Sequence, residues 1–439
     1  MPRILIVGGG YAGFYTALKL EKWLRKGEAE VVMVDPLPYM TYQPFLPEVA
    51  AGSIEPRHAV VSHRRHLRRT RVITAKVSSL QHASKTATIE PEVGEPFELD
   101  YDHVVMTAGS VSRTFPIPGV ADEAIGMKSI EEAVAVRDRL IDNFHRAALL
   151  PPGPERDRLL TVVVVGGGFA GIETFAELRS LASALLKEHP TLTIDDTHFH
   201  LIEAMGRIMP EVSLKTSHWV LKNLAQRAAI VHLETQLTSA VDGHLELSTG
   251  ESLESDLIIW TAGVMANPVL RGTDLPVDER GRLRAQADLR VVDDNGVVEA
   301  AWTAGDVAAV PDLSGGGVGG FCVPNAQHAV RQGKRLAANV VAVLRGEDPK
   351  DYEHKNLGAV AGLGLGYGAF QSGKIGITGF AAWIMHRGYH GLAIPMWERK
   401  LRVVGDWVGN VVFGRDNVSL SAREEPAAYF QEFAARPKG

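Results

Sequence analysis

The hydrophobic pattern of the chain changes in the same way at two separate places. In each, a run of apolar residues leads into three consecutive glycines, after which apolar residues recur at helical spacing. A short apolar run that ends in glycine is typical of a buried parallel strand, and the later spacing predicts an amphipathic helix. The chain is therefore expected to contain two strand–turn–helix units, RILIVGGGYAGFYTALKL at 3–20 and LLTVVVVGGGFAGIETFAEL at 159–178.

The glycines of each unit follow the spacing GxGxxG. In a dinucleotide-binding turn the first glycine forms the tight turn, the second lets the backbone approach a pyrophosphate, and the third lets the helix pack on the strand. A second predicted strand follows each unit and ends in a carboxylate, Asp35 or Glu203, that can accept from a ribose hydroxyl. Two dinucleotide sites are predicted, with Gly8, Gly10 and Gly13 in the first and Gly166, Gly168 and Gly171 in the second.

The second site favours NADH over NADPH. A carboxylate at Glu203 would repel the 2′-phosphate of NADPH, while Arg207 nearby leaves the choice of coenzyme open. The interval from Gly171 to Glu203 is 32 residues, which is longer than usual. We therefore expect the second helix to extend through AELRSLASALLKEH.

Three further segments read as a strand that ends in a small turn. Two of them, YDHVVMTAGS and SDLIIWTAGV, follow the first and second units and place Gly109 and Gly263 in their turns. The third, EAAWTAGDVAAVPD, ends its strand at Gly305 and Asp306. By its position after a strand, Asp306 is compatible with a helix N-cap.

Composition narrows the class of protein. With 439 residues, 45% hydrophobic and 22% charged, the chain is long enough for two or three globular domains, and its net charge of −6 gives no support to nucleic-acid binding. The single cysteine, Cys322, excludes a CxxC redox pair and fits a reducing compartment. No segment has the roughly 18 continuous apolar residues of a spanning helix, and the N-terminus does not read as a signal peptide.

These motifs together resemble the two-dinucleotide flavoprotein reductases. The resemblance implies an α/β fold with two Rossmann-like domains, non-covalent FAD at the first GxGxxG and the pyridine nucleotide at the second. It also implies that Asp35 contacts the FAD adenosine ribose and Asp306 the ribitol. The expected domains are an FAD-binding domain at 1–115 and 290–350, an NADH-binding domain at 116–289, and a C-terminal domain at 351–439.

Within that group, the absence of paired or active-site cysteines leaves reductases whose acceptor is not sulfur. The segments YQPFLPEVAAGSI, GGGFAGIETFAEL and PNAQHAVRQGKRLAANV resemble type II NADH dehydrogenases, which are non-pumping NADH:quinone oxidoreductases. In that family an AQxAxQ segment opens the helix behind the third FAD motif and lies against the flavin and the quinone. Ala326, Gln327 and Ala329 match the segment, whereas Arg331 replaces its second glutamine.

The resemblance gives these residues provisional roles. Gln327 would donate to a carbonyl of menaquinone or ubiquinone, and Arg331 would hold a developing quinol anion. Glu173, placed by the sequence in the first turn of the second helix, would lie beside the nicotinamide and take part in proton delivery. The open alternatives are a surface position for Arg331 and stabilisation of Glu173 by the helix dipole alone.

The C-terminal part carries a candidate membrane contact. Two short strands are predicted within 359–383, followed by a helix after Pro395 with an apolar face. The resemblance implies a peripheral, monotopic protein at the cytoplasmic face of the cell membrane, and a homodimer stays open. The alternatives are a helix packed on its own domain in a soluble reductase that serves a protein such as ferredoxin, and an NADH-sensing regulator. The apolar face comprises Trp397, Leu401, Val404, Val408 and Val411, and Trp383, Trp397 and Trp407 resemble interfacial anchors.

Overall fold

The computed structural model describes residues 1–315, 317–354 and 358–419. These residues form two compact units, each assembled from three stretches of the chain. Unit 1 contains the described residues of 1–41, 60–111 and 264–354, and unit 2 contains those of 42–59, 112–263 and 358–419. Each unit holds one of the two predicted strand–turn–helix segments.

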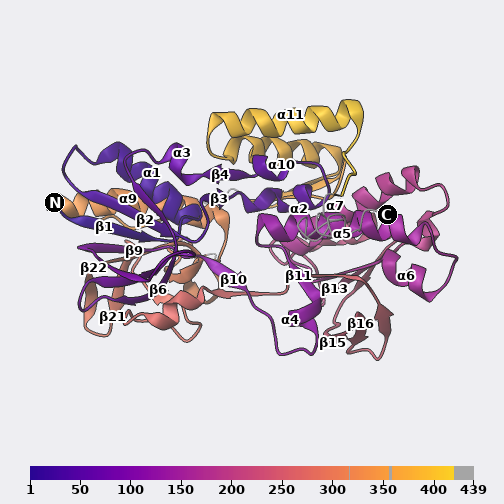
Figure 1. Ribbon diagram of the computed structural model, residues 1–439, viewed down its shortest axis with the longest axis horizontal. Helices are drawn as coiled ribbons and strands as arrows, with labels where there is room; N and C mark the ends of the chain where they lie inside the picture. The colour runs from indigo at the N-terminus through magenta and orange to yellow at the C-terminus, as the bar shows by residue number, and fades with distance from the viewer. Residues whose placement is uncertain (316, 355–357, 420–439) are drawn as a thin grey trace, which may run out of the picture. The chain divides into compact units, whose positions relative to one another are not determined.

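Unit 1 is built on a six-stranded sheet in the order β21-β22-β9-β1-β2-β5, which is parallel except for the β21–β22 pair. The apolar run at 4–7 forms its buried central strand, as the sequence predicts. The helices α1 and α9 pack against each other beside this sheet (Figure 1). The strands are β1 (Arg3–Val7), β2 (Glu30–Asp35), β5 (Arg71–Thr74), β9 (His103–Met106), β21 (Arg290–Asp293) and β22 (Gly296–Thr303), and the helices are α1 (Tyr11–Trp23), α3 (His63–His66) and α9 (Ala326–Leu344).

Smaller strands complete unit 1. An antiparallel sheet of β6, β7 and β8 joins the main sheet through one hydrophobic core, in which Leu80 and Ile89 are buried with Leu5 and Val104. Two short strand pairs, β3 with β4 and β20 with β23, are hydrogen-bonded separately from these two sheets. These strands are β3 (Tyr39–Thr41), β4 (Val60–Ser62), β6 (Lys76–Gln81), β7 (Thr86–Glu90), β8 (Phe97–Asp100), β20 (Leu283–Arg284) and β23 (Ala308–Ala309), with β10 (Ser110–Ser112) and β19 (Val264–Ala266) at the unit boundary.

Unit 2 repeats the design with a five-stranded parallel sheet in the order β11-β18-β12-β13-β14. The helix after its glycines, α7 (Phe169–Glu188), has 20 residues, so the predicted long helix is confirmed. The remaining elements are β11 (Ala124–Gly126), β12 (Thr161–Val165), β13 (His198–Ile202), β14 (Ala229–His232), β15 (Leu237–Val241), β16 (His244–Leu247), β17 (Ser252–Glu254), β18 (Leu257–Trp260), α2 (Leu46–Ala50), α4 (Val120–Glu123), α5 (Ile130–Ala147), α6 (Pro154–Leu160) and α8 (Leu214–Ala225).

The C-terminal part of unit 2 forms three strands rather than the two that were predicted. β24 (Ala359–Gly362), β25 (Gly368–Ser372) and β26 (Ile375–Thr378) make an antiparallel sheet, because the glycines between them form turns that the apolar pattern does not reveal. The helices α10 (Phe380–Ala393) and α11 (Trp397–Phe413) follow and contact each other (Figure 1).

The predicted α/β class is confirmed, and the unit boundaries differ from the predicted domain boundaries at several places. The predicted C-terminal domain is not a separate unit, since residues 351–354 lie in unit 1 and residues 358–419 lie in unit 2, which also contains residues 112–115. Residues 264–289 lie in unit 1, where Leu270, Leu275 and Leu283 enter the core of its sheets. Residues 42–59 lie in unit 2, where α2 packs on α5 and α7. Which nucleotide each unit holds stays a prediction.

Candidate active site

The first glycine turn in unit 1 leaves no room for a side chain at two of its three positions. Gly8 has a φ of +96°, and a Cβ on Gly13 would lie 1.8 Å from the Gly8 carbonyl oxygen. The hydroxyl of Thr107, at the end of β9, donates to the carbonyls of Val7 and Gly8 at 3.0 and 2.9 Å. Strand, turn and helix are thus held together by contacts that only glycine permits.

Unit 2 contains the same turn with almost the same distances. Gly166 has a φ of +113°, and a Cβ on Gly171 would lie 1.9 Å from the Gly166 carbonyl oxygen. Thr261, at the end of β18, donates to the carbonyl of Val165 at 2.8 Å. The two predicted dinucleotide turns therefore share one local geometry.

The middle glycine of each turn is not required by the backbone conformation or by a close contact within the chain. Gly10 and Gly168 have extended backbones that any residue can adopt, with φ values of −66° and −71°. Among the described residues, no atom lies within 4 Å of a Cβ placed on either glycine. Each is the N-cap of a helix, α1 or α7, whose first turn contains no acidic residue. Open space at a helix N-terminus fits the pyrophosphate of a dinucleotide.

The predicted ribose carboxylates are also held alike. Asp35 at the end of β2 accepts from the Gly9 N–H at 2.5 Å and the Leu37 N–H at 2.7 Å. Glu203 after β13 accepts from the N–H groups of Gly167 and Met205 at 2.5 and 2.7 Å. Burial raises the pKa of Asp35 above its ordinary value. A carboxylate has about four lone-pair sites, so each keeps acceptor capacity for a ribose hydroxyl.

Arg207, the residue that left the choice between NADH and NADPH open in the sequence, contacts backbone carbonyls in the structure. Its guanidinium donates to the carbonyl of Val212 at 2.5 Å and lies 3.4 Å from that of Met209. These contacts engage one of its two amino groups, Nη2, so Arg207 still leaves the choice of coenzyme open. The preference for NADH that Glu203 indicates stays a prediction.

Glu203→Ala is expected to reduce the preference for NADH over NADPH by about 10-fold in kcat/KM, because it removes both a ribose acceptor and the charge that repels a 2′-phosphate. Steady-state rates with both coenzymes, using ferricyanide as acceptor, measure this ratio. Asp35→Ala is the matched control, since it alters the corresponding carboxylate of unit 1. An unchanged ratio in Glu203→Ala would remove Glu203 from the coenzyme site.

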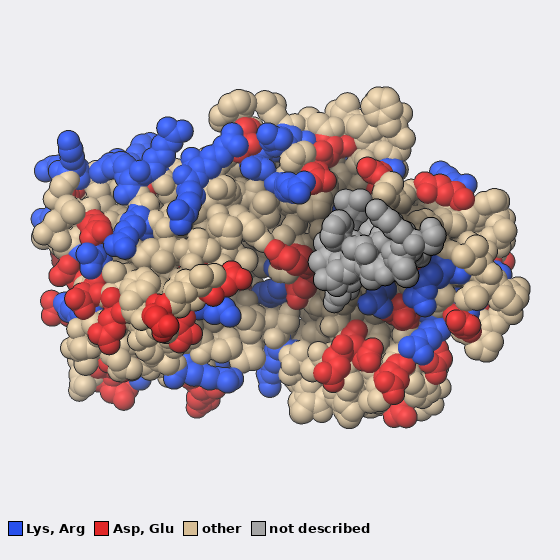
Figure 2. Space-filling model, in the orientation of Figure 1, with Lys and Arg blue, Asp and Glu red and all other residues tan. Residues whose placement is uncertain are grey.

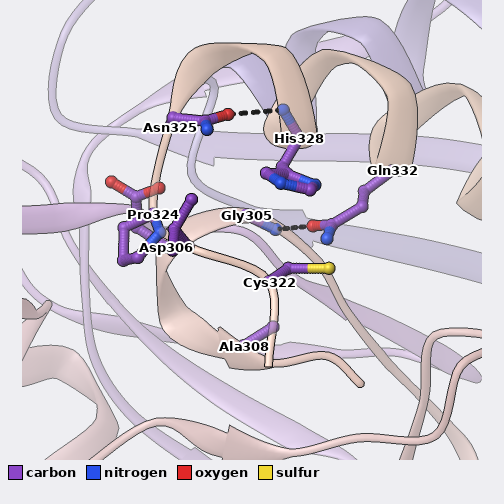
Figure 3. A pocket seen from close by; sticks show the side chains of 9 residues that line it. Gly305, Asp306, Ala308, Cys322, Pro324, Asn325, His328 and Gln332 are labelled. Atoms are coloured by element: carbon purple, nitrogen blue, oxygen red, sulfur yellow. Dashed lines mark hydrogen bonds between the residues drawn. The ribbon is translucent and has the colours of Figure 1, made fainter. Parts of the chain in front are cut away.

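The third motif lies against the first turn in unit 1. Gly305 has a φ of +77°, and its N–H donates to Oε1 of the buried Gln332 at 2.7 Å (Figure 3). Asp306 accepts from the Ser110 hydroxyl at 2.6 Å, next to Gly109, which has a φ of +71°. In unit 2 the corresponding turn contains Gly263, with a φ of +89°. The Ser110–Asp306 hydrogen bond thus joins the turns that contain Gly109 and Gly305, and their contact with a cofactor stays a prediction.

The segment that opens α9 lines a pocket together with Gly305 and Asp306 (Figure 3). The Asn325 side chain accepts from the His328 N–H at 2.8 Å and caps α9, whose start the sequence predicts near Pro324 and Asn325 (Figure 3). Arg331, one turn after Gln327, lies 3.4 Å from the amide oxygen of that residue. Cys322 also lines the pocket, and burial, with Asp312 nearby, raises the pKa of its thiol to about 11. A protonated thiol at neutral pH is a poor nucleophile.

Glu173 lies in unit 2 and is tied to the C-terminal part of the chain. The sequence predicts Glu173 in the first turn of α7, where the helix dipole would favour it most, but this prediction is wrong. The first turn contains no acidic residue, and Glu173 lies in the second turn. Its Oε1 accepts from the Gly362 N–H at 2.8 Å and lies 3.2 Å from Nε2 of the buried His386. The helix dipole is therefore not what holds this carboxylate.

The His386 ring belongs to a buried network of charged groups. Burial by itself lowers the pKa of His386, but Glu173, with Glu48 and Glu177 nearby, raises it above the ordinary value. Glu48 pairs with Arg387 at 3.1 Å and accepts from the Trp407 indole at 2.8 Å. The arrangement can hold a proton beside Glu173 at neutral pH.

This network was not anticipated from the sequence. Glu48 lies more than 300 residues from its partners on α10 and α11, and no short motif connects them. The roles of Thr107, Thr261 and Gln332 were also missed. A signal for the two threonines existed, because the tripeptide Thr-Ala-Gly occurs at 107, 261 and 303, each time at the end of a strand of a main sheet.

Two matching dinucleotide turns, each backed by a strand-ending carboxylate, define the class of protein as a reductase built on two dinucleotide-binding folds. The chain belongs to the pyridine nucleotide-disulphide oxidoreductase family, which it matches over residues 2–333.

Known proteins similar to the chain are consistent with that membership. A probable NADH dehydrogenase of Dictyostelium discoideum is 27% identical over 94% of this chain and 90% of its own. The type II NADH:quinone oxidoreductase NdhA of Mycobacterium tuberculosis is 26% identical over 92% and 86%. The structure of NDH2 from Plasmodium falciparum in complex with NADH has a TM-score of 0.86 at 17% identity, and covers 95% of this chain and 99% of that one. The last likeness establishes the fold.

Proposed function

We propose that the protein is an FAD-dependent NADH:quinone oxidoreductase that reduces a membrane quinone, menaquinone or ubiquinone, without pumping protons. The occurrence of the same nucleotide turn in both units carries the proposal, since a hydride donor and a resident flavin each need one. The relatives named as NADH dehydrogenase and NADH:quinone oxidoreductase over nearly the whole chain support it. Reduction of bound flavin by NADH and its reoxidation by quinone test this function.

In this proposal each unit supplies binding and placement. Unit 1 holds non-covalent FAD with the N-terminus of α1 at Gly10, the ribose acceptor Asp35 and the ribitol contact Asp306. Unit 2 holds NADH with the N-terminus of α7 at Gly168 and with Glu203. FAD, when bound, supplies the redox chemistry by accepting a hydride and passing two electrons on.

The acceptor residues in the proposal are Gln327 and Arg331. An amide can donate to a quinone carbonyl, and a fixed guanidinium can stabilise the charge that develops during reduction. Glu173, paired with His386, would hold or pass a proton during the reaction.

We also propose that α10 and α11 attach the protein peripherally to the cytoplasmic face of the cell membrane. The predicted apolar face of α11 is exposed, with Leu401 and Val408 at 63% and 57%, and Figure 2 shows much of the surface along its outer edge without charge. No helix in 1–315, 317–354 or 358–419 is long and apolar enough to span a bilayer. Trp397 is exposed, whereas Trp383 is buried and Trp407 donates to Glu48, so only Trp397 of the three suits an interfacial anchor.

The double substitution Leu401→Glu and Val408→Glu is expected to release the protein from membranes, because it places two charges on the face that would enter the lipid. Sedimentation with vesicles of phosphatidylglycerol and phosphatidylcholine measures binding, and at least a 10-fold loss is expected. Val93→Glu with Leu149→Glu is the matched control, since these two residues are also exposed, at 88% and 87%, but lie outside α10 and α11. Equal binding by both double variants would contradict the attachment through α11.

A further inference from the structure

Arg331 is held by a histidine that the proposed reaction does not use. Its Nη1 donates to Nδ1 of His354 at 2.8 Å, and the same nitrogen makes the longer contact of 3.4 Å to the Gln327 amide oxygen. A guanidinium donates hydrogen bonds and cannot accept them. Nδ1 of His354 must therefore carry its lone pair, which makes the ring neutral with its proton on Nε2.

The groups around His354 keep it in this form. The ring of His328, from α9, lies with its centroid 4.2 Å away, and the Tyr352 hydroxyl lies 3.5 Å from Nδ1. Burial lowers the pKa of His354, and the Arg331 charge lowers it further, against a smaller opposing effect of Asp312. His328 is itself neutral near pH 7, since burial and His354 lower its pKa to about 4.

The same contacts orient the amide of Gln327. Because Arg331 can only donate, the side-chain oxygen of Gln327 is the atom that faces it, which directs the amide nitrogen elsewhere. One acceptor, the His354 ring, thus restrains a long cation and, through it, the amide one turn earlier on α9. Restraint of this kind is what a site needs when it stabilises charge by preorganised groups.

We propose that neutral His354 is the positioning residue for Arg331 and thereby sets the lower pH limit of acceptor reduction. The proposal rests on the proposed function, in which Arg331 faces the acceptor. When His354 takes a proton on Nδ1, two cations face each other at the present hydrogen bond, and Arg331 leaves its place. Because the pKa of His354 is depressed, the ring is neutral above pH 6.5. The neutral form is lost as the pH falls through the depressed pKa.

The first test measures the pair without any acceptor. In FAD-loaded protein labelled at the histidine Cε1 carbon, NMR titration gives the pKa of His354, whose signal is assigned by its loss in His354→Gln. In Arg331→Gln the pKa of His354 is expected to rise, because a neighbouring positive charge is removed. An unchanged pKa would overturn the proposal.

The second test measures reoxidation of NADH-reduced enzyme by a soluble quinone from about pH 8 to about pH 5. The wild-type rate is expected to fall at the acid end, toward that of Arg331→Ala, as the pH falls through the depressed pKa of His354. His354→Gln, whose amide oxygen accepts from Arg331 but does not titrate, should lack this fall. His218→Gln, which alters an exposed histidine on α8, should retain it.

The same acid fall in His354→Gln as in the wild type would overturn the role of His354. Failure of the proposed function gives a different result, since wild-type flavin would then be reduced by NADH but not reoxidised by quinone at any pH. That result would overturn the role in acceptor reduction, and the NMR shift would show that the His354–Arg331 pair itself is intact.

Discussion

Gly10→Ala is expected to leave the protein folded while weakening its binding of FAD roughly 10- to 100-fold, the scale of one lost charge-assisted hydrogen bond. The backbone of Gly10 is extended and an added Cβ meets no described atom within 4 Å, so the chain itself accepts alanine. The methyl group would occupy the space in which a pyrophosphate approaches the N-terminus of α1. Flavin retention after gel filtration and titration of the apoprotein with FAD measure the loss.

Gly168→Ala is the matched variant in unit 2. It should bind FAD like the wild type and raise the KM for NADH, because the same space at α7 is closed instead. Gly13→Ala differs from both, since its Cβ would overlap the Gly8 carbonyl oxygen, and it should disturb folding of unit 1. If Gly10→Ala bound FAD with wild-type affinity, the pyrophosphate would not lie at this turn.

Arg331→Ala is expected to leave flavin reduction by NADH nearly unchanged and to slow reoxidation by quinone roughly 10- to 100-fold, the effect of losing a charge-assisted hydrogen bond of ~1.5–3 kcal/mol in the transition state. In the proposed function NADH binds to residues of unit 2, so its half-reaction would not require this side chain. Stopped-flow absorbance of the flavin separates the two half-reactions.

Arg331→Gln is the control for charge, because an amide can donate to a carbonyl without carrying a positive charge. It should recover part of the quinone rate or change the preferred quinone. Ferricyanide, which accepts electrons at any exposed flavin edge, should respond to neither substitution. Wild-type rates in both half-reactions of both variants would place Arg331 outside the acceptor site.

Features that depend on residues close together in the sequence could be predicted from the sequence. The glycines at 8, 10 and 13 act within one turn, so their spacing alone indicates their different roles, and the same holds for 166, 168 and 171. Asp35 and Glu203 were placed because each ends an apolar run that forms a buried strand. The start of α9 and the exposed apolar face of α11 follow from patterns of the same kind.

Features that depend on distant pairing could not be predicted. Glu48, His386 and Arg387 read as ordinary polar residues, and only the fold buries them together. Trp383 and Trp407 looked like interfacial anchors because a hydrophobic pattern does not distinguish a face packed on Arg387 from one exposed to lipid. His354 carries no motif at all, and its contact with Arg331 appears only when the chain after α9 folds back.

The most direct test of the account is anaerobic stopped-flow of the purified holoprotein, first with NADH and then with menaquinone and ubiquinone analogues, compared with ferredoxin. We predict that NADH bleaches the flavin absorbance in a single turnover and that a quinone restores it without any protein partner, while ferredoxin does so far more slowly. Reduction by NADH followed by reoxidation only with ferredoxin would contradict the quinone acceptor. Folded protein that cannot be loaded with FAD would contradict the whole account.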